Sequence, residues 1–432
     1  MQDNYLWLEE VESQKSLNWI HAQNEKSDEY FKNNRFYSSD CSIYEKSFLS
    51  KDRLPQMVLH KDWFYSVLQN TEHPQGVWRR ISVDNYLTKA DQWQIILDLD
   101  HLSQQENKKW FLSRFNFLLS GELALLGLSN GGSDAVFWKE FDLQKLSFVI
   151  DGFSLPESKS HLGWYDENTV IFADALTSGS QTVSGYARQL RVWRRGEAFS
   201  ESSVLYSIAE GEFSLSMQID QSQKNMLIFH GLNFTKIKII LVKDLRELLP
   251  LNLPYETDAV YFFKNRLFVR NLKDWLFSDQ TLKAGSLISW PLADLHPQSQ
   301  NIQIHFSPSS AEVLSDYFLT ENFLLILKLK NIQPQITCFQ YSEGGFFEKT
   351  IAWPDKSVVN LAAASHYSDK VLWRASDFLQ PAQLIFTDLT GPIGAPYSEG
   401  SQSFKAQVVQ QLTTQFDTSN FIKEQLWAIS KD

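Results

Sequence analysis

The sequence has only two cysteines, Cys41 and Cys338, in 432 residues. No C-x-x-C pair occurs and no histidines stand at a spacing that suits zinc, so the sequence indicates neither a disulfide framework nor a zinc site. We therefore predict two reduced structural thiols in a cytoplasmic protein, although a disulfide between them stays open. We expect no metal and no cofactor.

An excess of basic residues is also missing. Lys and Arg number 40 against 51 Asp and Glu, which gives a formal net charge of −11. A protein that binds nucleic acid normally needs a concentrated basic face to displace counterions, so we expect no nucleic-acid partner.

Long apolar runs are absent as well. The longest of them, residues 323–329, is far shorter than the roughly 20 residues that span a bilayer. The beginning of the chain, MQDNYLWLEE, is acidic and has no basic region followed by an apolar one. We therefore predict no membrane segment and no signal peptide.

Helical patterns are scarce. Ser13 can cap a helix that runs through Leu17 and Ile20 toward Phe31, with charged residues on the exposed positions. We predict this as the only helix in the first half of the chain, within a helical N-terminal segment at residues 1–50.

Short strands are plentiful instead. Residues 123–128, 136–141 and 146–150 form three apolar runs, separated by polar turns, of which 129–134 is rich in Gly, Asn and Ser. Each run is nearly continuous rather than alternating, so both faces of this small sheet are expected to be covered, as in a blade between two other blades.

The same pattern continues along residues 51–430. Further runs lie at 56–59, 63–68, 77–82, 93–97, 169–173, 190–193, 204–207, 226–230, 236–242, 259–263, 267–269, 287–290, 323–329, 335–339, 370–374 and 383–387. So many strands with so few helices exclude a doubly wound α/β fold and leave a β-propeller or stacked sandwiches. Roughly 375 residues at about 40 to 55 per blade allow seven or eight blades.

One motif of a catalytic serine occurs, Gly127-Leu128-Ser129-Asn130-Gly131. A nucleophile elbow needs a strand, a strained turn and then a helix, whereas Ser129 is followed by a polar turn and another strand. The later histidines stand singly, with no local sign of a base paired to a carboxylate; they are His161, His230, His296, His305 and His366. We therefore predict a β-turn after Ser129 and no catalytic residue in this chain.

Charged residues offer little more. Arg188, Arg191, Arg194 and Arg195 form the one basic cluster, which could bind a carboxylate or phosphate but is better explained by salt bridges on the rim or between blades. The carboxylates are expected in solvated turns and at strand ends; they include Glu9, Glu10, Asp98, Asp100 and Asp151.

Nine short segments share a likeness to one family. They are YLWLEE at 5–10, AQN at 22–24, LSNGGSD at 128–134, EFD at 140–142, DGF at 151–153, PESK at 156–159, SGYAR at 184–188, WRRG at 193–196 and SDFLQP at 376–381. In this order they resemble the prolyl oligopeptidase family of serine peptidases, and residues 421–432 resemble the strand by which that family's chain leaves its propeller.

The resemblance implies an all-β fold, a seven-bladed propeller of four-stranded antiparallel blades at residues 51–430. In that family an α/β-hydrolase domain follows the propeller and holds the catalytic Ser, Asp and His, so these residues would lie beyond Asp432. The chain is then expected to be inactive alone, and to gate access of short peptides to such a hydrolase. A stand-alone propeller that serves as an interaction scaffold is the alternative.

The segment 1–50 is implied to pack on the hydrolase in that family. Burying Leu6, Leu8, Leu17 and Ile20 contributes about 1.5 to 3 kcal/mol each, whereas ordering the segment costs on the order of 1.5 kcal/mol per residue. We therefore expect residues 1–50 to be mobile, wrongly docked or engaged in self-association when the chain is alone.

Overall fold

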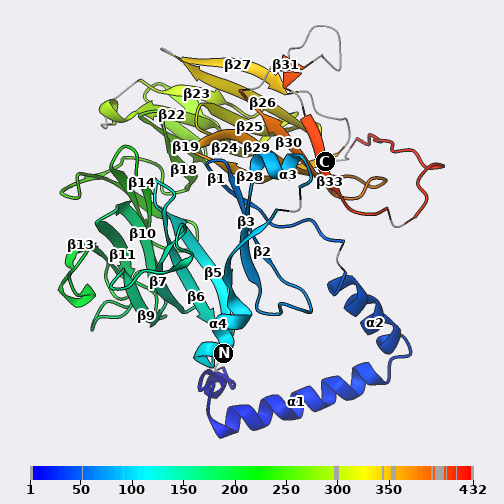
Figure 1. Cartoon of the computed structure of the whole chain (residues 1–432). Coiled ribbons are helices and arrows are strands. Elements are labelled where there is room, and N and C mark those ends of the chain that lie inside the picture. Colours follow the sequence, from blue (N-terminus) through cyan, green and yellow to red (C-terminus); the bar gives the residue numbers. More distant parts are fainter. Residues whose placement is uncertain are drawn as a thin grey trace. The chain divides into compact units, whose positions relative to one another are not determined.

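The computed structural model describes residues 3–50, 52–90, 92–295, 301–342, 345–351, 357–390, 393–394, 403–404, 406–414 and 416–429. It divides into two compact units, Met1–Arg53 and Leu54–Asp432. Figure 1 shows the first unit as helices and the second as a set of small sheets.

The first unit contains η1 (Leu6–Glu9), α1 (Gln14–Lys32) and α2 (Tyr37–Phe48). Ser13 caps α1, because its Oγ accepts a hydrogen bond from the Ser16 amide at 3.2 Å, as the sequence predicts. Among residues 3–50, Ser16 alone is buried. Most large apolar side chains of the unit are exposed; they include Leu17, Trp19, Ile20, Tyr30, Phe31, Ile43, Tyr44 and Phe48.

The prediction of one helix in the first half of the chain is wrong. Besides α2, the second unit contains α3 (Val83–Leu87) and α4 (Leu99–Glu106). Both begin directly after a strand, at the side-chain caps Ser82 and Asp98, and both are too short to show an apolar stripe. No helix among the described residues is long and apolar enough to cross a membrane.

The second unit forms seven antiparallel blades within the described residues, as predicted. Blade 1 contains β1 (Val58–His60), β2 (Trp63–Leu68), β3 (Val77–Ser82) and β4 (Gln94–Asp98). Blade 2 contains β5 (Trp110–Phe117), β6 (Leu123–Asn130), β7 (Val136–Asp142) and β8 (Ser147–Phe148), and β9 (Ser154–Ser158) also pairs with β7. Blade 3 contains β10 (His161–Asp166), β11 (Thr169–Asp174), β12 (Gln189–Arg194) and β13 (Ser203–Ser207), with η2 (Phe199–Glu201) before β13.

The next four blades repeat this order. Blade 4 contains β14 (Ser214–Asp220), β15 (Asn225–Gly231), β16 (Ile237–Lys243) and β17 (Glu247–Pro250). Blade 5 contains β18 (Thr257–Phe263), β19 (Arg266–Asn271), β22 (Leu287–Pro291) and β23 (Gln303–Phe306), with a hairpin of β20 (Trp275–Phe277) and β21 (Gln280–Leu282), and with η3 (Leu292–Asp294) after β22. Blade 6 contains β24 (Glu312–Leu319), β25 (Phe323–Lys330), β26 (Gln333–Ser342) and β27 (Gly345–Ile351). Blade 7 contains β28 (Val358–Ser365), β29 (Ser368–Ser376), β30 (Gln383–Asp388) and β33 (Ala406–Gln411). A hairpin of β31 (Ile393–Gly394) and β32 (Ser403–Phe404) lies between β30 and β33.

Packing on both faces of the blades explains the continuous apolar runs. In β6, Ala124 and Leu126 pack with Tyr65 and Trp78 of blade 1. Leu125 belongs to another cluster, which includes Leu162 and Trp164 of blade 3. Alternate residues of one strand therefore face opposite neighbours, and every position along the strand must be apolar.

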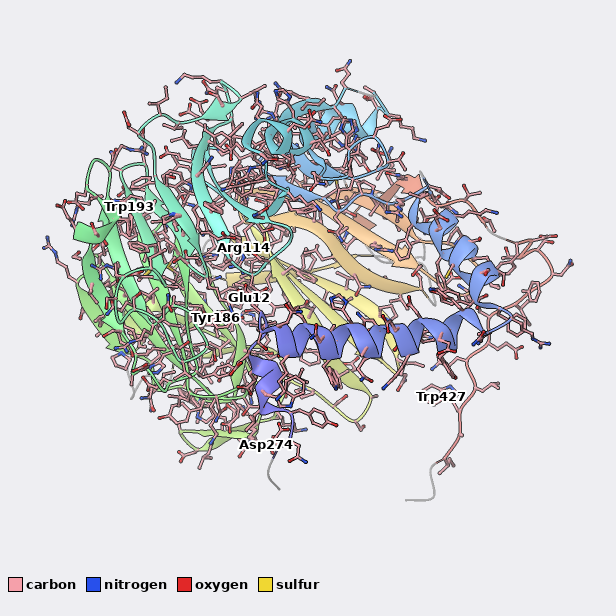
Figure 2. All side chains as sticks on the ribbon, turned by 90° about the horizontal axis from the view of Figure 1, so that it is seen from below. Glu12, Arg114, Tyr186, Trp193, Asp274 and Trp427 are labelled. Carbon is pink, nitrogen blue, oxygen red and sulfur yellow. The ribbon has the colours of Figure 1, made fainter. Side chains whose placement is uncertain are left out.

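The first strand of each blade lies nearest the axis of the ring, which Figure 2 shows from the end. Strand β10 contacts both β5 and β14, and β28 contacts both β24 and β1, so the last blade meets the first. The described residues of blades 1 and 7 share no strand. Their junction is an apolar cluster that includes Phe64 and Leu372, together with an ion pair of 2.5 Å between Asp62 and Lys370.

Candidate functional site

The two ends of the ring consist of different loops. One end carries the loops that join the first strand of each blade to the second, here named the narrow face, and also the loops that join the third strand to the fourth. The other end, here named the wide face, is formed by the loops that join the second strand to the third and by those that lead into each first strand. Because the strands are antiparallel, these two sets of loops lie at opposite ends of the blades.

Hydrogen bonds between blades tie the narrow face together. Lys61 Nζ donates to the Ser120 carbonyl at 2.6 Å, and Lys264 Nζ donates to Asn322 Oδ1 at 2.9 Å. The buried carboxylate of Asp369 accepts from both the amide and the side chain of Asn322 at 2.7 Å. These bonds join blades 1 and 2, 5 and 6, and 6 and 7.

Gln221 connects two blades that are not neighbours in the ring. Its Oε1 accepts from the Leu119 amide at 2.8 Å and its Nε2 donates to the Phe117 carbonyl at 3.0 Å. Gln221 belongs to blade 4 and its partners to blade 2, so the side chain reaches past blade 3. The narrow face is thereby drawn together at the inner ends of three blades.

A cavity of about 280 Å³ opens among these loops. Its lining includes Asp220, Lys264, Glu321, His366 and Tyr367, which come from blades 4 to 7. Burial lowers the pKa of His366, although the charge of Asp220 acts in the opposite direction. The space can hold water or a small polar group but no folded domain.

His60 lies at the inner end of β1, next to this cavity. Its ring stacks on Phe117 with centroids 4.5 Å apart and meets the edge of Tyr367 at 5.6 Å. The side chain is 6% exposed, and its Nε2 has no hydrogen-bond partner among the described residues. Burial, helped by the charge of Lys61, lowers the pKa of His60 to about 4.

We expect His60 to make the fold weaker in acid. Between its ordinary pKa of 6.5 and its folded pKa of about 4, the unfolded chain binds a proton that the folded protein does not. The free energy of unfolding therefore falls as the pH falls through this range, by roughly 1 kcal/mol per pH unit from this group, and levels off below it. His161 and His305, whose pKa values are lowered to about 4 and about 3, act in the same direction.

The variant His60→Phe tests this expectation. It keeps the stack on Phe117, and Gly121 leaves room beside the ring. Urea unfolding near pH 7 and near pH 5 is expected to show a smaller loss of stability for the variant than for the parent chain. The control is His101→Phe, because His101 is exposed on α4. An unchanged pH dependence in His60→Phe would contradict the prediction.

Exposed apolar side chains gather on the wide face. They include Val183, Phe213, Phe234, Tyr255, Leu272, Leu276, Ile332 and Phe378. The seven loops of the narrow face, all of which lie within the described residues, carry no large hydrophobic side chain that is exposed. Exposed apolar side chains that gather at one end of a fold are typical of a site where another domain docks.

Two cavities open on the wide face. One, of about 890 Å³, is formed by blades 2 to 4, and the other, of about 820 Å³, by blades 4 and 5. They share Ser216, Met217 and Phe234 in their linings. The rings of Phe213 and Phe234, with centroids 4.4 Å apart, form an apolar wall of the larger one. Both cavities have the size of sites for small ligands or short peptides.

Charged side chains line the cavity of 890 Å³. Lys159 Nζ lies 4.3 Å from the centroid of the Tyr186 ring, and the Tyr186 hydroxyl donates to Asp134 Oδ2 at 3.4 Å. Burial, with a smaller effect of the Arg114 charge, lowers the pKa of His161 to about 4, so this imidazole is neutral near pH 7. Figure 2 shows Arg114 on the inner side of the ring, whereas Trp193 lies toward the rim.

A chain of polar contacts reaches the same cavity at Glu212. The Tyr206 hydroxyl lies 3.0 Å from Nδ1 of the buried His230, and the Nε2 of His230 lies 3.0 Å from Glu212 Oε1. The amide of Ala209 also donates to Glu212, and this bond is the main reason why the pKa of Glu212 is lowered. These contacts fix the entrance to blade 4 against blade 3.

Ser129 has no geometry of a nucleophile. It is 2% exposed and lies within β6, where it pairs with Phe111 of β5. A turn and then β7 follow it, as the sequence predicts, and no helix begins there. Gly127 of the same motif pairs with Arg114, and a Cβ at Gly127 would lie 3.4 Å from the Trp138 indole. The glycine is therefore explained by packing.

The arginine cluster is dispersed by the fold. Arg195 forms a salt bridge between blades, with both nitrogens of its fork 3.0 Å from the carboxylate of Glu140 in β7. Arg191 lies 3.8 Å from the buried Asp174 within blade 3, and Arg194 is exposed. Arg188 is half-buried. The predicted salt bridge between blades is thus confirmed for Arg195, whereas the contact of Arg191 lies within one blade.

The remaining histidines, the cysteines and a cluster of carboxylates are explained by contacts within the fold or lie outside the described residues. His305 is held by Ser289 Oγ at 2.7 Å and His296 lies outside the described residues. Cys338 is buried in β26 and Cys41 is exposed on α2. His73, Asp98 and Asp100 come within 4.8 Å of one another, but Asp98 caps α4 and Asp100 accepts the amides of Gln75 and Gly76.

The resemblance implies an exit strand at residues 421–432, and the described part of it, residues 421–429, lies in a segment, 416–429, that differs from this expectation. It forms no strand within these residues, because its contacts run through side chains to loops of the wide face. Lys423 pairs with Asp377 at 2.6 Å, and the side-chain Nε2 of Gln425 donates to the Asn331 carbonyl at 3.0 Å. The chain thus continues across blades 6 and 7, while residues 430–432 lie outside the described residues.

Comparisons with known proteins agree with this architecture. The family model for the prolyl oligopeptidase N-terminal beta-propeller domain matches residues 1–397. An uncharacterized peptidase of Sinorhizobium fredii is 27% identical over 449 residues and covers 100% of this chain, and one of Rickettsia prowazekii is 24% identical over 445 residues and covers 99%. The chain spans 59% and 60% of the lengths of these two relatives.

A solved structure shows the same fold. The post-proline cleaving enzyme from Rickettsia typhi superposes with a TM-score of 0.85 at 22% identity, over 97% of this chain and 62% of that one.

Seven blades around an axis, with exposed apolar side chains on the wide face and none on the described loops of the narrow face, define a β-propeller domain. More particularly, the chain belongs to the prolyl oligopeptidase family, of which it is the N-terminal propeller domain.

Proposed function

We propose that this propeller restricts access to a serine peptidase site, so that short unfolded peptides enter and folded proteins do not. The difference between its two faces supports the proposal. On the narrow face, hydrogen bonds join the blades around a cavity of about 280 Å³. This cavity is too small to admit a folded domain. The wide face carries the exposed apolar side chains and the two larger cavities.

In this proposal the wide face packs against an α/β-hydrolase domain that supplies the Ser, Asp and His. The exposed apolar side chains of α1 and α2 cover part of the same domain, and their burial contributes about 1.5 to 3 kcal/mol for each large side chain. The likeness to a post-proline cleaving enzyme supports peptides with proline before the cleaved bond as substrates. The chain alone is inactive, because its one serine motif is buried in a strand.

A fluorophosphonate probe tests the assignment of catalysis. We expect no labelling of the 432-residue chain, and labelling of the hydrolase serine when the chain is produced together with a hydrolase domain of this family. The variant Ser129→Ala is the control. A covalent adduct of the isolated chain that disappears in Ser129→Ala would overturn the proposal.

Hydrogen exchange on the same two samples tests the docking surface. The hydrolase is expected to protect amides of wide-face loops, such as residues 232–236 and 272–274, and to leave narrow-face loops such as 221–224 unchanged. Protection of neither face by the hydrolase would favour the alternative of a stand-alone interaction scaffold.

A further inference from the structure

We propose that Arg114 binds a carboxylate of the peptide substrate in the wide-face cavity of blades 2 to 4. The inference rests on the proposed function, because it names a chemical group of the peptides that this propeller admits. It concerns binding to the propeller itself and involves none of the reacting groups.

The backbone directs Arg114 into the cavity. Arg114 lies on the innermost strand β5, directly after an irregularity in the pairing of β5 with β6 between Leu112 and Arg114. Such bulges change the direction of the next side chain. The residue paired with Arg114 is Gly127, so no side chain of β6 covers the stem of the arginine. The guanidinium is exposed and contributes to the lining of the 890 Å³ cavity.

Most other charges of this cavity have partners. Lys159 lies over the Tyr186 ring, and Asp134 accepts from the hydroxyl of the same tyrosine. Glu212 contacts His230 and the Ala209 amide. Arg114 and Glu210 are left as the charged side chains of the lining that have no hydrogen bond or ion pair within the described part of the chain.

The surroundings of Arg114 favour an anionic group of the ligand. His161, which is neutral near pH 7, can donate or accept a hydrogen bond without adding charge. A guanidinium holds a carboxylate through two parallel hydrogen bonds, a geometry that lysine lacks. Glu210 comes from the loop that leads into blade 4, whereas Arg114 projects from blade 2, so the two charges enter the cavity from different blades.

The cavity also suits the rest of a short peptide. Phe213 and Phe234 form an apolar wall, and Val183 and Tyr186 are exposed beside it. A volume of about 890 Å³ accommodates a few residues rather than a folded domain. The carboxylate can come from the peptide's own C-terminus or from an acidic side chain, and the experiment separates these sources.

Calorimetric titration of the 432-residue chain with three peptides tests the inference. The probes are acetyl-Ala-Ala-Phe-Gly with a free carboxylate, its C-terminal amide, and the amide of acetyl-Ala-Glu-Phe-Gly. We expect the free acid to bind about tenfold tighter than the neutral amide, the effect of one hydrogen-bonded charge pair that stays partly hydrated. Equal tightening by the glutamate peptide would assign the site to carboxylates in general, and its absence would assign it to the C-terminus.

Variants place the effect on Arg114. Arg114→Gln is expected to abolish the difference between acid and amide and Arg114→Lys to retain part of it. Arg194→Gln, which removes an exposed arginine outside the cavity lining, is expected to keep it in full. Equal urea unfolding midpoints of the variants show that the fold is intact.

Three results would overturn the inference. They are equal binding of acid and amide, a preference for the acid that survives in Arg114→Gln, and no saturable binding of any of the three peptides. The titration contains no hydrolase. A negative titration therefore does not affect the labelling and exchange experiments, and negative results in those experiments do not affect the titration.

Discussion

Replacing Arg195 by alanine is expected to lower the free energy of unfolding by about 3 kcal/mol, because it leaves a buried carboxylate without its partner. Glu140 is 2% exposed and lies where blades 2 and 3 meet. Both of its oxygens accept from the Arg195 fork at 3.0 Å, and Oε2 also accepts from the Phe153 amide at 2.8 Å. The guanidinium further lies 4.6 Å from the centroid of the Phe153 ring, so its loss also removes packing.

Two variants make this prediction specific. Glu140→Gln is expected to cost clearly less, because the Arg195 side chain is 30% exposed and can be hydrated when the carboxylate is gone. Arg194→Ala, one position earlier and exposed, is expected to stay within about 0.5 kcal/mol of the parent chain. Urea unfolding followed by tryptophan fluorescence measures all three. If Arg195→Ala were as stable as Arg194→Ala, the salt bridge between blades 2 and 3 would not stabilise the folded chain.

The second strand of each blade could be predicted from the sequence for a physical reason. Strands such as β6 and β25 are covered by neighbouring blades on both faces, so their residues form nearly continuous apolar runs. Each of the predicted runs overlaps a strand of the structure. The number of blades could not be obtained from this rhythm alone, and the resemblance to a family was needed to choose seven.

Five of the seven innermost strands were missed because they line the axis of the ring. They include β5, β10, β14, β24 and β28, which no predicted run covers. One side of such a strand packs on its blade and the other is open to solvent, so Arg114 and Ser216 interrupt the apolar pattern. The outer strands β17, β23 and β27 were missed as well, since an edge strand needs few buried residues.

The candidate site could not be predicted from the sequence for the same reason, the interrupted apolar pattern of the inner strands. Arg114 and His161 lie on unpredicted inner strands, and Gln221 follows one. The SGYAR segment at 184–188 was noticed only as part of a family likeness, yet Tyr186 within it lines the cavity. A functional surface assembled from seven blades has no continuous motif, so only the closed ring brings its residues together. By contrast, Ser129 could be excluded as a nucleophile from the local succession of strand, turn and strand alone. Such a succession can be predicted from neighbouring residues.

The variant Trp138→Ala is expected to have the largest effect on stability, a loss of about 3 to 5 kcal/mol in the free energy of unfolding. Trp138 is 0% exposed and belongs to the apolar cluster between blades 2 and 3. Its indole donates to the Ser160 carbonyl at 3.0 Å, so alanine leaves both a cavity and a buried acceptor without a partner.

The same substitution connects the core to the wide-face cavity. The His161 ring meets Trp138 edge to face with centroids 5.5 Å apart, and the space above Gly127 is filled by the indole. Trp138→Ala therefore removes the support of His161, and water can reach its imidazole. We expect its pKa, measured by NMR titration, to rise from about 4 toward the ordinary value of 6.5. Trp427→Ala is the control, since Trp427 is 72% exposed, and should change neither quantity. A stable Trp138→Ala with an unchanged His161 pKa would show that the junction of blades 2 and 3 does not position this side of the cavity.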